Sequence, residues 1–118
     1  SASMIGFVSK ACSYTYMTLR AKCRLAADDP EWALYWLQIA LAMCPKGKWD
    51  RRCQIRYLMG KCYAKLCLRC RYDQSWGIGD IHKARMLVES EIGYATRAEE
   101  EFRHALNLCK NHTEDILK

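Results

Sequence analysis

The stretch from Trp32 to Cys44 constrains the fold more than any other part of the chain. Twelve of its thirteen residues are apolar, and only Gln38 interrupts the run. A helix that is apolar on every side is stable in water only when other elements cover it. The run is also too short to cross a bilayer, which takes about twenty residues. We therefore expect a buried helix at the centre of a domain that does not span a membrane.

The rest of the chain has helical periodicity. Gly and Pro are scarce, and apolar residues recur every three or four positions instead of alternating. Asp29, Asp50 and Asp80 are suitable N-caps, and Pro30 suits the first helical position. Short connections make successive helices antiparallel. The sequence predicts an all-α fold with helices at 4–26, 30–44, 50–71 and 80–110.

The last predicted helix is long for a domain of this size. Gly93 lies inside it and costs about 1 kcal/mol relative to Ala. The apolar steps of three and four continue on both sides of Gly93, which favours one unbroken helix. We expect 4–26 to cover one side of the apolar helix, and 50–71 with 80–110 to cover the other. Residues 1–3 resemble a cloning remnant, so the predicted single domain covers 4–118.

The eight cysteines bear on the cellular compartment. An even number permits disulfides. Most of these cysteines, however, lie at helical spacing on apolar faces, where a free thiol behaves as a small hydrophobic side chain. No secretory signal is visible near "MIGFV". We expect a reducing, intracellular compartment, cytoplasmic or nuclear, and no required disulfide.

One cysteine pattern has the spacing of a zinc site. Cys67-x2-Cys70 and Cys109-x2-His112 together supply four ligands of suitable type. The helical rise separates the two halves by roughly 40 Å, unless the last helix folds back at Gly93. We therefore expect no metal and no other cofactor.

The chain shows no arrangement of residues typical of catalysis. The three histidines have no obvious nucleophile as a partner, and Glu99-Glu100-Glu101 is typical of a solvated helix face. Gly77-x-Gly79 precedes a helix but follows no strand, which disfavours a phosphate-binding loop. The sequence predicts a protein that is not an enzyme and has no small-molecule substrate.

Positive charge is concentrated in the segment 46–72. It has nine basic residues and one acidic residue, Asp50, whereas 73–118 has six basic and nine acidic residues. One interpretation is a solvated helix face, partly paired with the acidic residues of the last helix. The other is a surface for an acidic ligand.

Two stretches share one spacing of small and large apolar residues. In "DPEWALYWLQIALAMCP" the pattern falls at Ala33, Leu37, Ala40, Leu41 and Pro45. In "RAEEEFRHALNLC" a similar pattern falls at Ala98, Phe102, Ala105 and Leu106. Both stretches resemble the second helix of a tetratricopeptide repeat (TPR), in which small residues allow close helix packing and large residues fill the gap.

Other residues extend the resemblance to most of 14–109. Ala21 occupies the small position of a first helix, and "YLMGKCYAKL" resembles the first helix of a second repeat at Leu58, Gly60 and Tyr63. A second helix beginning at "GDIHKA" would use Ala84 and Val88 instead. Arg20 and Arg24 occupy positions where the family has apolar or aromatic residues. The resemblance implies antiparallel hairpins stacked as a short TPR-like array, and the structural alternative is a plain four-helix bundle.

The resemblance also implies a function, because the first helix of each TPR hairpin lines a concave groove that binds peptides. The family's carboxylate clamp uses asparagines, but Lys22 and Leu58 occupy the corresponding positions here. Lysines beside a tyrosine suit an acidic or amphipathic segment of a partner protein. The groove-facing positions are Thr18, Lys22, Gln54, Tyr57, Lys61 and Lys65.

Two alternatives to this interpretation remain. The basic face of 46–72 is suited to nucleic acid, although no RNA-binding signature is present. If the groove does not bind the partner, the expected alternative site is the outer face with Arg51, Arg52 and Arg69. The other alternative is a structural subdomain whose groove is covered by the rest of a larger protein.

For the core, we expect Trp36 to be buried, with Trp36→Ala costing about 3–5 kcal/mol. The other predicted anchors are Val8, Leu19, Ile55, Leu58, Cys62 and Leu66.

Overall fold

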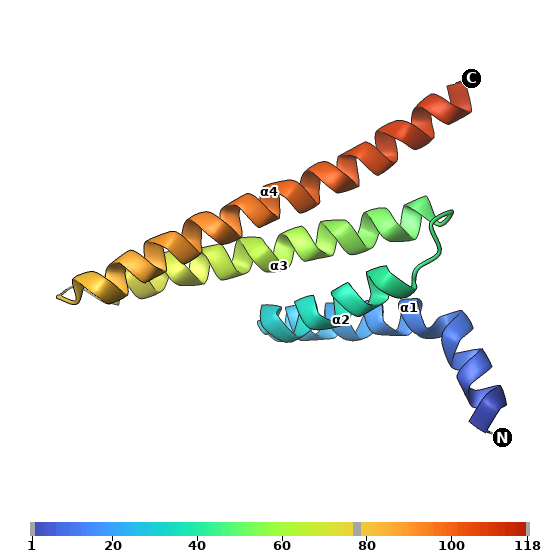
Figure 1. Ribbon diagram of the computed structural model, residues 1–118, viewed down its shortest axis with the longest axis horizontal. Helices are drawn as coiled ribbons and strands as arrows, with labels where there is room; N and C mark the ends of the chain where they lie inside the picture. Colours follow the sequence, from blue (N-terminus) through green and yellow to red (C-terminus); the bar gives the residue numbers. More distant parts are fainter. Residues whose placement is uncertain (1, 77–78, 118) are drawn as a thin grey trace.

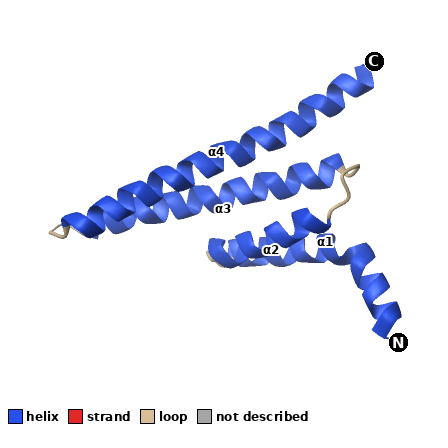
Figure 2. Ribbon diagram, in the orientation of Figure 1, coloured by secondary structure: helices blue, strands red, loops and turns tan. Residues whose placement is uncertain are grey.

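The computed structural model describes the backbone of residues 2–76 and 79–117, and the side chains of 13–73 and 79–117. Within these ranges every regular element is an α-helix (Figures 1 and 2), as the periodicity predicts. The helices are α1 (Ala2–Ala26), α2 (Pro30–Met43), α3 (Trp49–Trp76) and α4 (Ile81–Leu117).

The predicted caps begin two of the helices. The Asp29 carboxylate accepts a hydrogen bond from the Trp32 amide at 3.4 Å, and Pro30 occupies the first turn of α2. The Asp80 carboxylate accepts from the Lys83 amide at 3.1 Å. Helix α4 continues through Gly93, which confirms the single long helix. Both α3 and α4 run past their predicted ends, and residues 77–78 of the expected loop lie outside the described residues.

The helices form two antiparallel hairpins, α1–α2 and α3–α4, and α3 lies between α2 and α4 (Figure 1). Helix α2 packs on α1 and α3, whereas α4 packs on α3 alone among the described helices. The expectation that 80–110 covers the apolar helix is therefore wrong. Helix α3 lies between α2 and α4, and no described helix covers the outer face of α2. Trp32 and Tyr35 on that face are 53% and 50% exposed.

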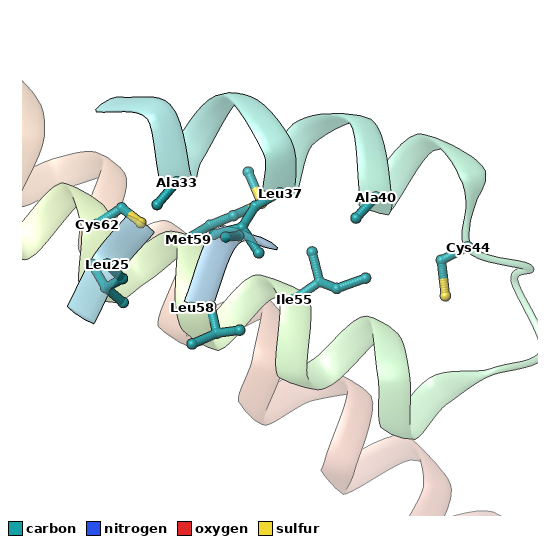
Figure 3. Packing of buried hydrophobic residues seen from close by; sticks show 10 residues of the cluster. Leu25, Ala33, Leu37, Ala40, Cys44, Ile55, Leu58, Met59 and Cys62 are labelled. Carbon is teal, nitrogen blue, oxygen red and sulfur yellow. The ribbon is translucent and has the colours of Figure 1, made fainter. Parts of the chain in front are cut away.

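The main core lies where α3 meets the first hairpin. Ile55, Leu58, Met59 and Cys62 pack against a surface of α1 and α2 residues (Figure 3). That surface consists of Ala21, Leu25, Ala33, Leu37, Ala40 and Cys44. Ile55, Leu58, Cys62 and Leu66 are buried, as predicted. Leu19 is 59% exposed, so its assignment to the core is wrong, and the side chain of Val8 lies outside the described residues.

Trp36 lies at the edge of this core. It is partly buried, and the Arg20 guanidinium stands 4.8 Å above the centre of its ring. This cation–π contact gives the arginine of α1 a partner on the neighbouring helix α2. The indole Nε1 is buried without a hydrogen-bond acceptor among the described residues. Trp36 is thus a boundary residue, whereas Leu37 beside it is completely buried.

Helix α4 approaches α3 closely at one point. A Cβ atom on Gly60 would lie 2.5 Å from Cε1 of Phe102. Tyr63, Leu66 and Ala98 form a second, smaller cluster here. The close approach therefore depends on the small residue at position 60.

None of the helices in the described part of the chain combines the length and apolar character needed to cross a lipid bilayer.

Candidate functional site

The structure brings three of the predicted lysines into one groove between α1 and α3. Lys22 comes from α1, and Lys61 and Lys65 come from α3. The groove has a volume of about 430 Å³, and its floor is apolar, formed with Leu25, Ala26 and Leu58. We call these six residues the lysine groove. Residues almost forty positions apart in the sequence thus share one surface.

The three lysines are not equivalent. The Lys65 ammonium donates to the Leu25 carbonyl at 3.5 Å and to the Asp28 carboxylate at 3.4 Å. It therefore satisfies a carbonyl group at the C-terminal end of α1, where a cation is favourable. Lys22 and Lys61 form no ion pair with any described residue. Lys61 and Lys22 are therefore the lysines of the groove best placed to meet a ligand.

Two further predicted residues lie in an adjoining hollow of about 140 Å³. Thr18 and Gln54 line it together with Lys22, which joins it to the lysine groove. Thr18 is almost fully buried, and its hydroxyl donates to the Tyr14 carbonyl at 2.6 Å. Thr18 is therefore engaged with its own helix, whereas Gln54 is half-buried and Arg51, which also lines this hollow, is exposed.

Tyr57 lies apart from both hollows. Its ring is tilted against Phe102 of α4, with 5.7 Å between the ring centres. A step of four residues advances about 40° around a helix, so Tyr57 and Lys65 point about 80° apart. Lys61 lies between them, with its ammonium 5.7 Å from the Tyr57 ring. The predicted stripe Tyr57–Lys61–Lys65 therefore spans two faces, one towards α4 and one towards α1.

Most of the arginines in 46–72 form ion pairs or hydrogen bonds with other residues of the same chain. Arg52 donates to the carbonyls of Leu41 and Cys44 at the end of α2, at 3.4 and 3.1 Å. Arg56 pairs with the buried Glu101 at 2.9 Å. Arg69 and Arg71 pair with Glu31 at 3.6 Å and with Glu91 at 2.8 Å. Of the proposed outer face, Arg51 alone is without an ion pair or hydrogen bond to a described residue.

The two halves of the zinc-like pattern lie at different places. Cys109 Sγ is 3.1 Å from Cys53 Sγ, and His112 stacks on Trp49 with 3.8 Å between ring centres, both near the start of α3. Cys67 and Cys70 lie in the second half of α3. Among the described residues, no group of three or more His, Cys, Asp or Glu side chains is placed to hold a metal.

Sequence reasoning missed an apolar hollow that involves the last helix. This apolar groove of about 620 Å³ lies between α3 and α4. Leu68, Phe102 and Leu106 line it, with Glu99 and Arg103 at its border. The available signal was the repeated spacing at Ala98, Phe102, Ala105 and Leu106, which implies a surface like that of α2. No protein-family model, no curated protein and no solved structure matches this chain.

Proposed function

We propose that this chain is a non-enzymatic protein–protein interaction module whose lysine groove binds an acidic, amphipathic segment of a partner protein. The observation that carries the proposal is the arrangement of Lys22, Lys61 and Lys65 around a floor made by Leu25 and Leu58. The ammonium groups attract carboxylates of the ligand, and the floor accepts an apolar side chain.

The use of the other cations favours a peptide over nucleic acid. Four arginines of 46–72 contact carboxylates or carbonyls of the protein itself. A phosphate backbone is bound mainly by exposed Lys and Arg at many points. The apolar floor of the lysine groove adds nothing to binding of phosphates. Binding of nucleic acid through 46–72 therefore has less support.

The fold is consistent with this function. Two antiparallel hairpins, with Ala21 buried and Gly60 lying against Phe102, are compatible with the resemblance to TPR proteins, which bind peptides. Cysteines such as Cys44 and Cys62 are buried in the core among apolar side chains, where a free thiol behaves as a small hydrophobic group, and this is typical of proteins in a reducing, intracellular compartment. The proposal includes this location, cytoplasmic or nuclear.

A peptide-display selection tests the proposal. Random peptides displayed on phage are selected on the immobilised protein and on the variant Lys22→Glu/Lys61→Glu. The control is Lys46→Glu/Lys48→Glu, which makes the same change in net charge at exposed lysines outside the groove. We expect the wild type and the control to enrich acidic peptides with at least one large apolar residue, and the groove variant to lose this enrichment. Equal enrichment on all three proteins, or no preference for acidic residues, would contradict the proposal.

A further inference from the structure

The two hairpins present matching surfaces, one of them covered and the other partly open, since Ala98 and Ala105 are buried but Leu106 is exposed. In the sequence, Ala33, Leu37, Ala40 and Leu41 of α2 have the same spacing as Ala98, Phe102, Ala105 and Leu106 of α4. On the first hairpin, helix α3 covers this surface, and Ala33, Leu37 and Ala40 are completely buried (Figure 3). On the second hairpin, Ala98, Phe102 and Leu106 line the apolar groove. Leu106 is 70% exposed.

The first helices of the two hairpins, α1 and α3, also have matching positions. Ala21 of α1 is almost completely buried, and Gly60 of α3 lies against the Phe102 ring of α4. When these two are aligned, Ile55, Leu58 and Cys62 of α3 correspond to Tyr16, Leu19 and Cys23 of α1. The α3 residues dock on the first hairpin and are buried.

No helix in the described part of the chain covers the corresponding face of α1. Tyr16 and Leu19 are 55% and 59% exposed, and Cys23 is exposed as well. These three residues form the docking face of α1. Arg20 and Arg24 border it, whereas the apolar groove is bordered by Glu99 and Arg103, which pair with each other at 2.8 Å.

We propose that the apolar groove between α3 and α4 binds the docking face of α1 from a second copy of this chain. Each copy has one groove and one docking face, on different hairpins. The contact therefore joins two different surfaces, so copies stack head to tail and the assembly grows beyond a dimer as the concentration rises. A following copy would contact α3 and α4 in the way that α3 contacts α1 and α2. The stacking does not require the lysine groove.

Two variants separate the halves of the proposed contact. Leu106→Glu places a charge in the groove, and Leu19→Glu places one on the docking face. Both residues are exposed in the single chain, so both variants should keep the helical circular dichroism of the wild type. Ile92→Glu is the control, since Ile92 is 62% exposed on α4 but does not line the groove.

Sedimentation velocity at several protein concentrations measures how many copies each variant assembles. We expect the wild type and Ile92→Glu to grow past two copies and each groove or face variant to stay monomeric. A mixture of Leu106→Glu and Leu19→Glu should form a one-to-one dimer and nothing larger, because one intact groove meets one intact face. A monomeric wild type, growth that stops at a dimer, or a mixture that stays monomeric would overturn the proposal. Loss of association in Ile92→Glu would assign the contact to the open face of α4 instead.

Discussion

A methyl group on Gly60 would lie 2.5 Å from Cε1 of Phe102, closer than carbon atoms in contact approach one another. A side chain at residue 60 would therefore require the Phe102 ring of α4 to move from its observed position. Gly93 is the opposite case, since nothing outside its own helix lies within 4 Å of its Cβ position. Both glycines lie inside long helices, so they form a matched pair.

Alanine at these two positions should change stability in opposite directions. Both substitutions gain helix propensity, about 1 kcal/mol for each. Gly93→Ala should therefore raise the free energy of unfolding by about 0.5–1 kcal/mol. Gly60→Ala should lower it by about 1 kcal/mol, because overpacking costs about 1–3 kcal/mol and exceeds the gain. Urea unfolding measures both values, and a stabilised Gly60→Ala variant would show that the Phe102 ring moves aside freely.

The pair formed by Arg56 and Glu101 should be among the most sensitive contacts of the second hairpin. Glu101 is 5% exposed, and both of its carboxylate oxygens accept from Arg56. Arg56→Met leaves a buried carboxylate without its partner and should cost about 3 kcal/mol. The exposed pair Arg103–Glu99 supplies the control, and Arg103→Met should cost about 0.5 kcal/mol or less. Similar losses in the two variants would mean that Glu101 is stabilised by water.

Leu37, not Trp36, should be the most sensitive residue of α2. Leu37 is completely buried, so Leu37→Ala should cost about 2–5 kcal/mol. Trp36→Phe keeps an aromatic ring under Arg20 and removes the buried N–H that has no acceptor among the described residues. It should therefore stay within about 1 kcal/mol of the wild type. Thermal unfolding compares the two variants, and a Trp36→Phe loss as large as that of Leu37→Ala would contradict this assignment.

The buried thiol of Cys62 should make stability depend on alkaline pH. Burial raises its pKa from 9.0 to about 11. Between these two values the unfolded chain loses the proton while the folded protein keeps it. The free energy of unfolding should therefore fall as the pH rises, by about 1.4 kcal/mol per pH unit for this group. Below the unfolded pKa this contribution is fully present.

Urea unfolding at about pH 8 and about pH 10 tests this dependence. Other groups also titrate in this range, so the wild type is compared with Cys62→Ala. The variant should lose less stability than the wild type between the two pH values. Cys23→Ala, at an exposed thiol, should lose as much as the wild type. An equal loss in all three proteins would show that Cys62 does not titrate differently in the two states.

The sequence predicts the helices well where local signals begin or end them. Asp29 and Pro30 start α2, and "PKG" follows its end. The periodicity predicts an end of α3 at residue 71, whereas the helix continues to Trp76, and Arg71 near the predicted end pairs with Glu91 of α4. Such a contact depends on a residue twenty positions away, and local periodicity does not reveal it.

The candidate site is predictable only in part. Lys22, Lys61 and Lys65 meet in one groove as the predicted positions require, whereas Tyr57 turns towards Phe102. The sequence shows that 32–44 is apolar on all sides, but it does not show which side stays open. Trp32 and Tyr35 are exposed because α4 packs on α3 and not on α2. Which face of α2 is covered depends on packing between helices, and the composition of one helix does not determine that packing.

The most direct test of the lysine groove is the dissociation constant of one acidic peptide for three forms of the protein. The probe is a fluorescent, helix-forming peptide with Leu on one face and Glu on the others, measured by anisotropy. Charge reversal is placed at Lys22 and Lys61, because Lys65 also supports the end of α1. We predict that Lys22→Glu/Lys61→Glu weakens binding at least about tenfold, or about 1.4 kcal/mol, and that Lys46→Glu/Lys48→Glu stays within about twofold of the wild type. Equal affinities for all three forms, or equal losses in the two variants, would show that the peptide does not bind in the lysine groove.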